Sequence, residues 1–149
     1  MMDMPGHVKP IVSIGRLLHC WGVWEDYDWL IVQAMEVSTR SWEIGDAAGV
    51  YMVADIKEGR SASVNIRIND KAYLGDKADT AHQAMIDYLF DGLGLVRMEA
   101  RTPAHLHGAI KFNKRLGFEF EGMIRRAGVV DGQPSDVWLG AIIRDKNDA

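Results

Sequence analysis

Three ionisable side chains in the second half of the sequence have the types and settings that proton transfer requires. His105 and His107 flank the expected start of a helix, and histidine titrates near neutral pH, so either can serve as an acid or a base. Glu99 stands at an outward position of an alternating segment and can accept a proton through water. Each also has a structural interpretation: two exposed histidines at a helix end, and a salt bridge from Glu99 to Arg97 or Arg101. The sequence leaves both interpretations open.

The two histidines belong to the segment around which the chain is organised, residues 105–122. Its apolar residues recur at a spacing near i, i+3, i+4 and i+7, which predicts a short amphipathic helix. They are Ala109, Ile110, Phe112 and Leu116. Gly117 stands where the end of a helix needs a residue that tolerates a positive φ. A strand is expected directly after it.

Three further segments have the apolar spacing of helices. They cover residues 11–21, 29–39 and 80–90, and the last is the clearest in the chain. Asp28 is a suitable N-cap for the middle helix, and Asp79 or Thr80 is suitable for the last. The polar residues 69–79 are expected to form a loop before that last helix.

Strands are expected where apolar and polar residues alternate. This pattern covers residues 41–44, 49–56, 62–68 and 95–102. Residues 118–130 and 137–143 are expected to pair as a long hairpin that turns at Asp131-Gly132. The order of elements predicts an α+β fold with a central mixed, mostly antiparallel sheet flanked by helices.

Charge and composition exclude several classes of function. The net charge of −4 and the pI of about 5.7 argue against nucleic-acid binding, which needs a basic face. The longest apolar run, residues 29–32, is far too short to cross a bilayer, and the first ten residues do not resemble a signal peptide. The single cysteine, Cys20, cannot form a disulfide within the chain. We therefore expect a cytoplasmic protein with no nucleic-acid or membrane partner.

Several segments between about Ser61 and Ile143 resemble the GNAT superfamily of acetyl-CoA-dependent N-acetyltransferases. The closest likeness is to the branch that acetylates ribosomal-protein alanine or diamines. The segment MIDYLFDGLGLVRMEAR is similar to the helix and strand after the cofactor loop, AIKFNKRLGFEFEGMIRR to the next helix and strand, and VVDGQPSDVWLGAII to the closing hairpin. The resemblance implies one domain over residues 1–149, with an acceptor-side part (1–60), a cofactor-side core (61–143) and a tail (144–149).

The resemblance also implies a mechanism. Acetyl-CoA would lie between two splayed middle strands, residues 64–68 and 96–101, with its carbonyl oxygen on a backbone N–H of the first strand. The N-terminus of the helix at residue 80 would hold the pyrophosphate. A primary amine of a protein N-terminus, a lysine or a small molecule then attacks the thioester directly, and no metal is required. The cofactor-binding residues implied in this way are Ile66, Arg67, Ile68, Gly75, Asp76, Lys77, Ala78, Asp79 and Thr80.

Two stretches depart from the family pattern. In the best placement of the phosphate loop, Leu74 replaces Arg or Gln, Lys77 replaces a glycine and Asp79 replaces a second small residue. A β-carbon at Lys77 crowds the backbone amides, and the charge on Asp79 repels phosphate, although Lys77 can itself pair with a phosphate. In the following helix Leu106 stands at the family's Asn position. Asn113 stands at the position of a Tyr that can protonate the leaving thiolate, and Asn can only hydrogen-bond.

Two hypotheses about function follow. The first is an N-acetyltransferase that moves an acetyl group from acetyl-CoA to a primary amine, with Glu99, His105, His107 and Asn113 as catalytic candidates. The alternative is a catalytically inactive GNAT-fold protein with a binding or structural role, for which small phage-encoded proteins set a precedent. A homodimer through exposed strand edges near residues 137–143 is expected only by analogy.

Overall fold

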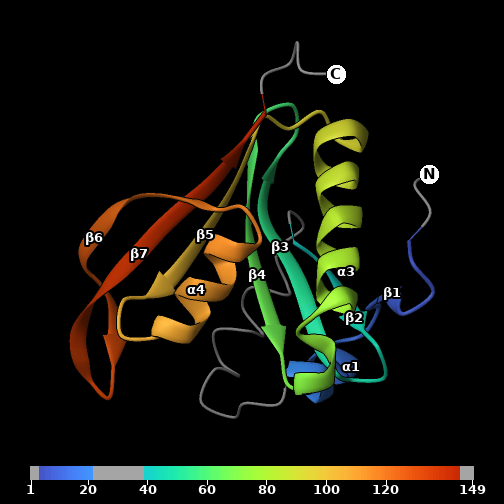
Figure 1. Ribbon diagram of the computed structural model, residues 1–149, viewed down its shortest axis with the longest axis horizontal. Helices are drawn as coiled ribbons and strands as arrows, with labels where there is room; N and C mark the ends of the chain where they lie inside the picture. Colours follow the sequence, from blue (N-terminus) through green and yellow to red (C-terminus); the bar gives the residue numbers. More distant parts are fainter. Residues whose placement is uncertain (1–3, 22–38, 145–149) are drawn as a thin grey trace.

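A computed structural model describes residues 4–21 and 39–144 of this chain. Its centre is a seven-stranded mixed sheet in the order β1-β2-β3-β4-β5-β7-β6 (Figure 1). The strands are β1 (Val8–Pro10), β2 (Arg40–Ile44), β3 (Gly49–Lys57), β4 (Ser61–Ile68), β5 (Arg97–Pro103), β6 (Glu119–Val130) and β7 (Gln133–Ile143). The helical segments are α1 (Ile14–Trp21), the 3-10 turn η2 (Lys71–Tyr73), α3 (Asp76–Ile86), the π-helical η3 (Asp87–Gly92) and α4 (His107–Arg115). This architecture confirms the predicted α+β fold.

Most predicted elements agree with the structure to within a few residues. The hairpin of β6 and β7 turns at Asp131 and Gly132, whose φ angles of 50° and 77° are both positive, as the tight turn between twisted strands requires. The first strand, β1, pairs antiparallel with β2. The helix predicted for residues 29–39 lies outside the described residues, apart from Thr39, as do Asp28 and residues 145–149.

The start of α3 corrects the sequence prediction. The helix begins at Asp76 rather than near residue 80, with Gly75 at its N-cap position, so the predicted loop 69–79 ends at Gly75. Asp76 and Asp79 both lie in the first turn, where negative charge is favourable beside the positive end of the helix dipole. The predicted apolar stripe is largely confirmed, because Ala81, Met85 and Leu89 are buried.

Among the described strands, the pairing of β4 with β5 is the one parallel register, and it is short. It runs from Ser61 opposite Arg97 to Val64 opposite Ala100. Beyond this point β4 continues beside β3 as far as Ile68, and β5 continues beside β7 through its last residue. The two middle strands are therefore splayed over their second halves, as expected, and α4 lies in front of the gap (Figure 1).

Alternating side chains of β3 divide the interior into two cores on opposite faces of the sheet. Tyr51 and Val53 belong to the larger core, which also holds the buried residues of α3. Val50 and Met52 belong to the smaller core, together with Leu17, Cys20 and Trp21 of α1. Helices α3 and α4 therefore cover one face of the sheet, and α1 covers the other.

A buried chain of hydrogen bonds joins β3, α3 and the end of α4. The Tyr51 hydroxyl lies 2.9 Å from Nδ1 of His82, and Nε2 of His82 lies 3.0 Å from the carbonyl oxygen of Leu116. Since a carbonyl can only accept, Nε2 carries the proton, and Nδ1 accepts from Tyr51. Both side chains are buried, and burial lowers the pKa of His82 from 6.5 to about 4 and raises the pKa of Tyr51. His82 is therefore a neutral, structural histidine at neutral pH.

This assignment predicts how stability depends on pH. His82 is protonated near pH 6.5 in the unfolded chain and only near pH 4 in the folded chain. The contribution of neutral His82 to the free energy of unfolding is therefore complete above pH 6.5 and is lost as the pH falls towards 4. The expected loss is about 3 kcal/mol across this interval. Urea denaturation at several pH values measures it. His82→Gln should remove this slope, and His107→Gln, at an exposed site, should retain it. An unchanged slope in His82→Gln would contradict the assignment.

Candidate active site

A cleft of about 980 Å³ lies where β4 and β5 separate. Residues at the ends of both strands form its floor, and α4 forms one wall. Trp21 of α1 and Leu74, just before α3, also line it. The lining is Trp21, Val64, Asn65, Ile66, Arg67, Ile68, Asn69, Leu74, Ala100, Arg101, Thr102, Pro103, Leu106, Gly108, Ala109, Lys111, Phe112, Asn113 and Arg115. Ala109, which belongs to the predicted apolar stripe of this helix, is exposed on this wall.

The main chain of β4 offers hydrogen-bond donors to the cleft. The N–H of Asn69 donates to the carbonyl of Ala48, on the β3 side. Because backbone groups in a strand alternate in direction, the N–H of Arg67 also faces β3, and those of Ile66 and Ile68 face the gap. Of the three residues predicted here, Ile66 and Ile68 can therefore offer backbone donors, and Arg67 can contribute its side chain.

The cleft is positively charged although the chain carries a net charge of −4. Four basic side chains line it: Arg67, Arg101, Lys111 and Arg115. Among the described residues, no carboxylate lines it. The Arg67 guanidinium lies 5.5 Å from the ring centroid of Trp21, and its Nε donates to Asn69. Such a lining favours an anionic ligand with an apolar portion.

The N-terminus of α3 lies next to this cleft, because Leu74 lines it just before the helix and the lining residue Arg115 pairs with Asp79. The first three N–H groups of a helix have no partner within it, so Asp76, Lys77 and Ala78 can offer amides to an anion. The N–H of Asp79 already donates to Gly75, and the hydroxyl of Thr80 donates to the carbonyl of Asp76. Of the predicted residues in this segment, Asp76, Lys77 and Ala78 can therefore offer main-chain N–H groups.

Arg115 resolves the charge conflict that the sequence predicted at Asp79. Its Nη1 lies 2.7 Å from Oδ1 of Asp79, and its Nη2 donates to the carbonyl of Leu74 at 2.8 Å. The guanidinium is half-exposed and lines the cleft. Asp79 is therefore paired, and a basic group from α4 lies beside Leu74. The Lys77 ammonium lies over the Tyr73 ring, 4.7 Å from its centroid.

Comparison with solved structures shows a known fold at low sequence identity. A GCN5-related N-acetyltransferase from Brucella melitensis matches with a TM-score of 0.76 and 19% identity, over 96% of this chain and 78% of that one. A probable acetyltransferase of the GNAT family from Chromobacterium violaceum matches at 0.74 and 20%, over 93% and 88%. A variant of the spermidine N-acetyltransferase SpeG from Vibrio cholerae matches at 0.72 and 21%, over 91% and 92%. The protein has the GNAT fold.

Sequence comparisons add no closer relative, since no protein-family model and no curated protein matches the chain. The GNAT fold confirms the architecture that the RLGF segment and its neighbours predicted. Among the described residues, no group of three or more His, Cys, Asp or Glu side chains is placed to hold a metal ion. No helix in the described part of the chain is long and apolar enough to span a membrane.

The predicted acid and base candidates fall outside the GNAT cleft. His105 and His107 are exposed, and the lining includes Leu106 and Gly108 but neither histidine. Asn113 does line the cleft and is buried, and its amide donates to the hydroxyl of Thr102 at 2.9 Å. Of the four catalytic candidates, the structure therefore brings Asn113 alone into the cleft.

Glu99 is held in an ion-pair network beside the cleft. Its carboxylate accepts from Arg97, from Arg101 and from the hydroxyl of Ser63, and Arg97 also bridges to Glu121 on β6. Partial burial opposes ionisation of Glu99, but the hydrogen bonds from Arg97 and the charge of Arg101 outweigh it and hold the pKa of the carboxyl below its usual range. This arrangement matches the salt-bridge interpretation, because a carboxylate with these partners is a weak base.

Sequence reasoning did not assign several residues of the lining to the site, and Thr102 and Arg115 are among them. Thr102 follows Met98 and Ala100 at the inward positions of β5, and a polar residue at an inward position was the available signal. Arg115 belongs to the RLGF segment, but its partners Leu74 and Asp79 lie on another element. No local pattern in the sequence indicates that contact.

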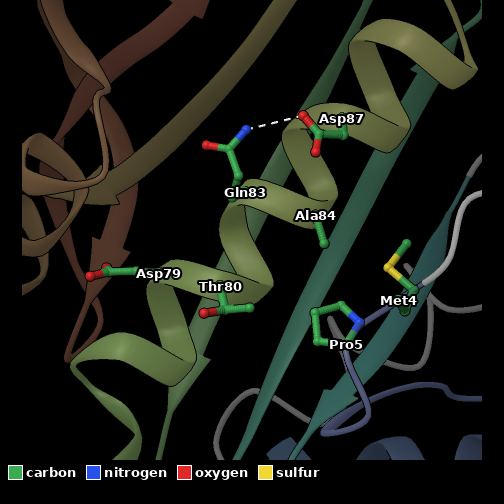
Figure 2. A pocket seen from close by; sticks show the side chains of 7 residues that line it. All are labelled: Met4, Pro5, Asp79, Thr80, Gln83, Ala84 and Asp87. Atoms are coloured by element: carbon green, nitrogen blue, oxygen red, sulfur yellow. Dashed lines mark hydrogen bonds between the residues drawn. The ribbon is translucent and has the colours of Figure 1, made fainter.

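A second depression, of about 680 Å³, lies on the outer side of α3 and carries no comparable chemistry (Figure 2). Its lining includes two carboxylates, but both already have partners. Asp79 points away from Met4 and Pro5 and pairs with Arg115, and Asp87 accepts from Gln83 at 3.0 Å. We therefore assign the candidate site to the cleft between β4 and β5.

The role of Glu99 can be tested by its effect on stability. Glu99→Gln leaves partly buried arginine hydrogen bonds without a charged acceptor, and we expect it to lower the free energy of unfolding by about 1–3 kcal/mol. Urea denaturation measures this change. Glu119→Gln, an exposed carboxylate on β6, is the matched control and should change stability by less than about 0.5 kcal/mol. Equal stabilities of the two variants would show that the network contributes nothing measurable.

Proposed function

We propose that the protein is an acetyl-CoA-dependent N-acetyltransferase that acts on a primary amine. The observation that carries this proposal is the cleft where β4 and β5 separate, with backbone donors on one side and four basic side chains around it. An acyl-CoA ester combines a polyanionic end with a long arm rich in amides and a reactive carbonyl. The lining offers groups suited to each of these parts.

The residues of the cleft suggest how such a ligand is held. The N–H groups of Ile66 and Ile68 are suited to the acetyl oxygen and to the amides of the pantetheine arm. The first-turn amides of Asp76, Lys77 and Ala78, together with Arg115, are suited to the pyrophosphate. When bound, acetyl-CoA supplies the thioester that an amine attacks directly. The chain's part is to orient the thioester and to stabilise the charge that develops on its oxygen.

The proposal also covers the acceptor, the division of the chain into an acceptor side and a cofactor side, and the location of the protein. The acceptor is a protein N-terminus, a lysine or a small amine, and one structural neighbour is a spermidine acetyltransferase. We place acceptor binding in residues 1–60 and cofactor binding in residues 61–143, which contain the amides and the basic residues of α4. The proposal also includes a cytoplasmic location, and it allows a homodimer that forms through the exposed strand edge near residues 137–143.

One observation favours the alternative, a GNAT-fold protein without catalysis. No histidine or carboxylate lines the cleft among the described residues, so these residues provide no evident general base. A binding module would keep the cleft without turnover. Incubation with acetyl-CoA and a panel of amines, read out as free thiol released, separates the two functions. Ligand binding without thiol release for any amine would favour the module.

Calorimetric titration with acetyl-CoA tests the anion site directly. We expect micromolar affinity, about 8 kcal/mol, and a decrease in affinity of roughly tenfold or more in Arg115→Gln, because a charge-assisted contact to phosphate is lost. Arg125→Gln removes the same charge from an exposed site on β6 outside the cleft and should bind like the wild type. No binding by the wild type at millimolar acetyl-CoA would overturn the proposed function.

Gly75→Asp tests the position of the phosphate subsite. A β-carbon at Gly75 meets no heavy atom within 4 Å, so the variant should fold with nearly wild-type stability. The added carboxylate lies at the N-cap of α3 and should repel the pyrophosphate, which lowers acetyl-CoA affinity by roughly tenfold. Wild-type affinity in this variant would show that the pyrophosphate binds elsewhere. Thermal denaturation of the same sample confirms folding.

A further inference from the structure

The wall of the cleft contains a pair of buried polar side chains from two elements. Thr102 of β5 is 7% exposed and Asn113 of α4 is 9% exposed, and both line the cleft. Nδ2 of Asn113 lies 2.9 Å from Oγ1 of Thr102. The preceding inward residues of β5, Met98 and Ala100, are apolar, so this pair interrupts an otherwise apolar face.

The direction of this hydrogen bond determines what the hydroxyl can do. An amide nitrogen can only donate, so the Thr102 oxygen accepts from Asn113 and keeps its own proton for another acceptor. Within the described part of the chain, that hydroxyl has no second hydrogen-bond partner. The main-chain carbonyl of Asn113 accepts from the N–H of Phe118, which fixes this end of α4. The result is a held hydroxyl with a proton available to a group in the cleft.

The register of the sheet places this hydroxyl opposite the proposed carbonyl-binding amide. Val64 is the last residue of β4 paired with β5, and its partner is Ala100. Two residues further along each strand, Ile66 and Thr102 stand on opposite sides of the gap and on the same face of the sheet. A thioester whose oxygen meets the N–H of Ile66 therefore has its sulfur within the part of the cleft that Thr102 lines.

We propose that the Thr102 hydroxyl is a catalytic hydrogen-bond donor to the sulfur of CoA, and that Asn113 is the residue that positions it. This inference rests on the proposed function. In the transfer, the amine nitrogen forms a bond to the acetyl carbon, the carbon–sulfur bond breaks and its electron pair leaves on sulfur. The nitrogen gives up one proton, and the sulfur gains one to become the thiol. Thr102 stabilises the negative sulfur and keeps its own proton, because an aliphatic hydroxyl is too weak an acid to lose it.

Binding of CoA compared with desulfo-CoA, which lacks the sulfur, tests this inference without an acceptor. Calorimetry of the wild type at pH 9 should show CoA bound about tenfold more tightly than desulfo-CoA, with a smaller difference at pH 7, because a thiolate accepts a stronger hydrogen bond than a thiol. Thr102→Val, which keeps the shape, should abolish the difference and leave desulfo-CoA affinity unchanged. Thr102→Ser should restore it. Asn113→Ala should reduce the preference for CoA over desulfo-CoA when both ligands are measured with the same variant.

The outcomes separate this inference from the function on which it rests. Wild-type binding of both ligands with no preference for CoA overturns the role of Thr102 and leaves the acetyltransferase proposal intact. The same conclusion follows if Thr102→Val keeps the full preference. If the wild type binds neither ligand, the proposed function fails and this inference fails with it. If Thr102→Val does not fold, the wild-type preference and the Thr102→Ser and Asn113→Ala variants still decide the question.

Discussion

The early end of the β4–β5 pairing is the constraint on which the rest of the site depends. Each strand keeps its other neighbour, β3 or β7, so the sheet stays intact while its middle opens. The backbone groups of Ile66 and Ile68 then face a gap instead of a strand. Because these N–H and carbonyl groups belong to the main chain, a change of side chain at these positions does not remove them. The cleft is therefore present although Leu74, Lys77 and Asn113 depart from the pattern of the family that the sequence resembles.

Ion pairing distributes charge so that an acidic protein has a basic cleft. Carboxylates beside the cleft are held by arginines, with Glu99 paired to Arg97 and Arg101 and Asp79 paired to Arg115. On the α1 side, Arg16 contacts Glu43 at 2.6 Å and Asp46 at 2.9 Å. Overall charge therefore says little about the preference of a site, because the placement of each charge decides it.

Local patterns predicted the local parts of this structure. The period-two segments and the RLGF helix end were readable because alternation and a positive-φ glycine are properties of neighbouring residues. The start of α3 was placed too late because Asp79 and Thr80 are typical caps, yet Asp76 also stabilises a first turn. The contacts of His82 with Tyr51 and of Arg115 with Asp79 join residues more than thirty positions apart, and no periodic pattern in the sequence indicates them.

The connections of α4 have a consequence for the thermodynamics of binding. The end of α4 is bonded to α3 through His82 and Arg115, and Asn113 bonds the helix to β5. Hydrogen bonds to two different elements therefore hold α4 in place beside the gap. The width of the gap beneath it is thus set during folding. A ligand that fits this width loses little conformational entropy of the protein on binding, and one that needs a wider gap must break buried hydrogen bonds. Selectivity between narrow and wide ligands would then follow from the fixed position of α4 rather than from contacts with the ligand.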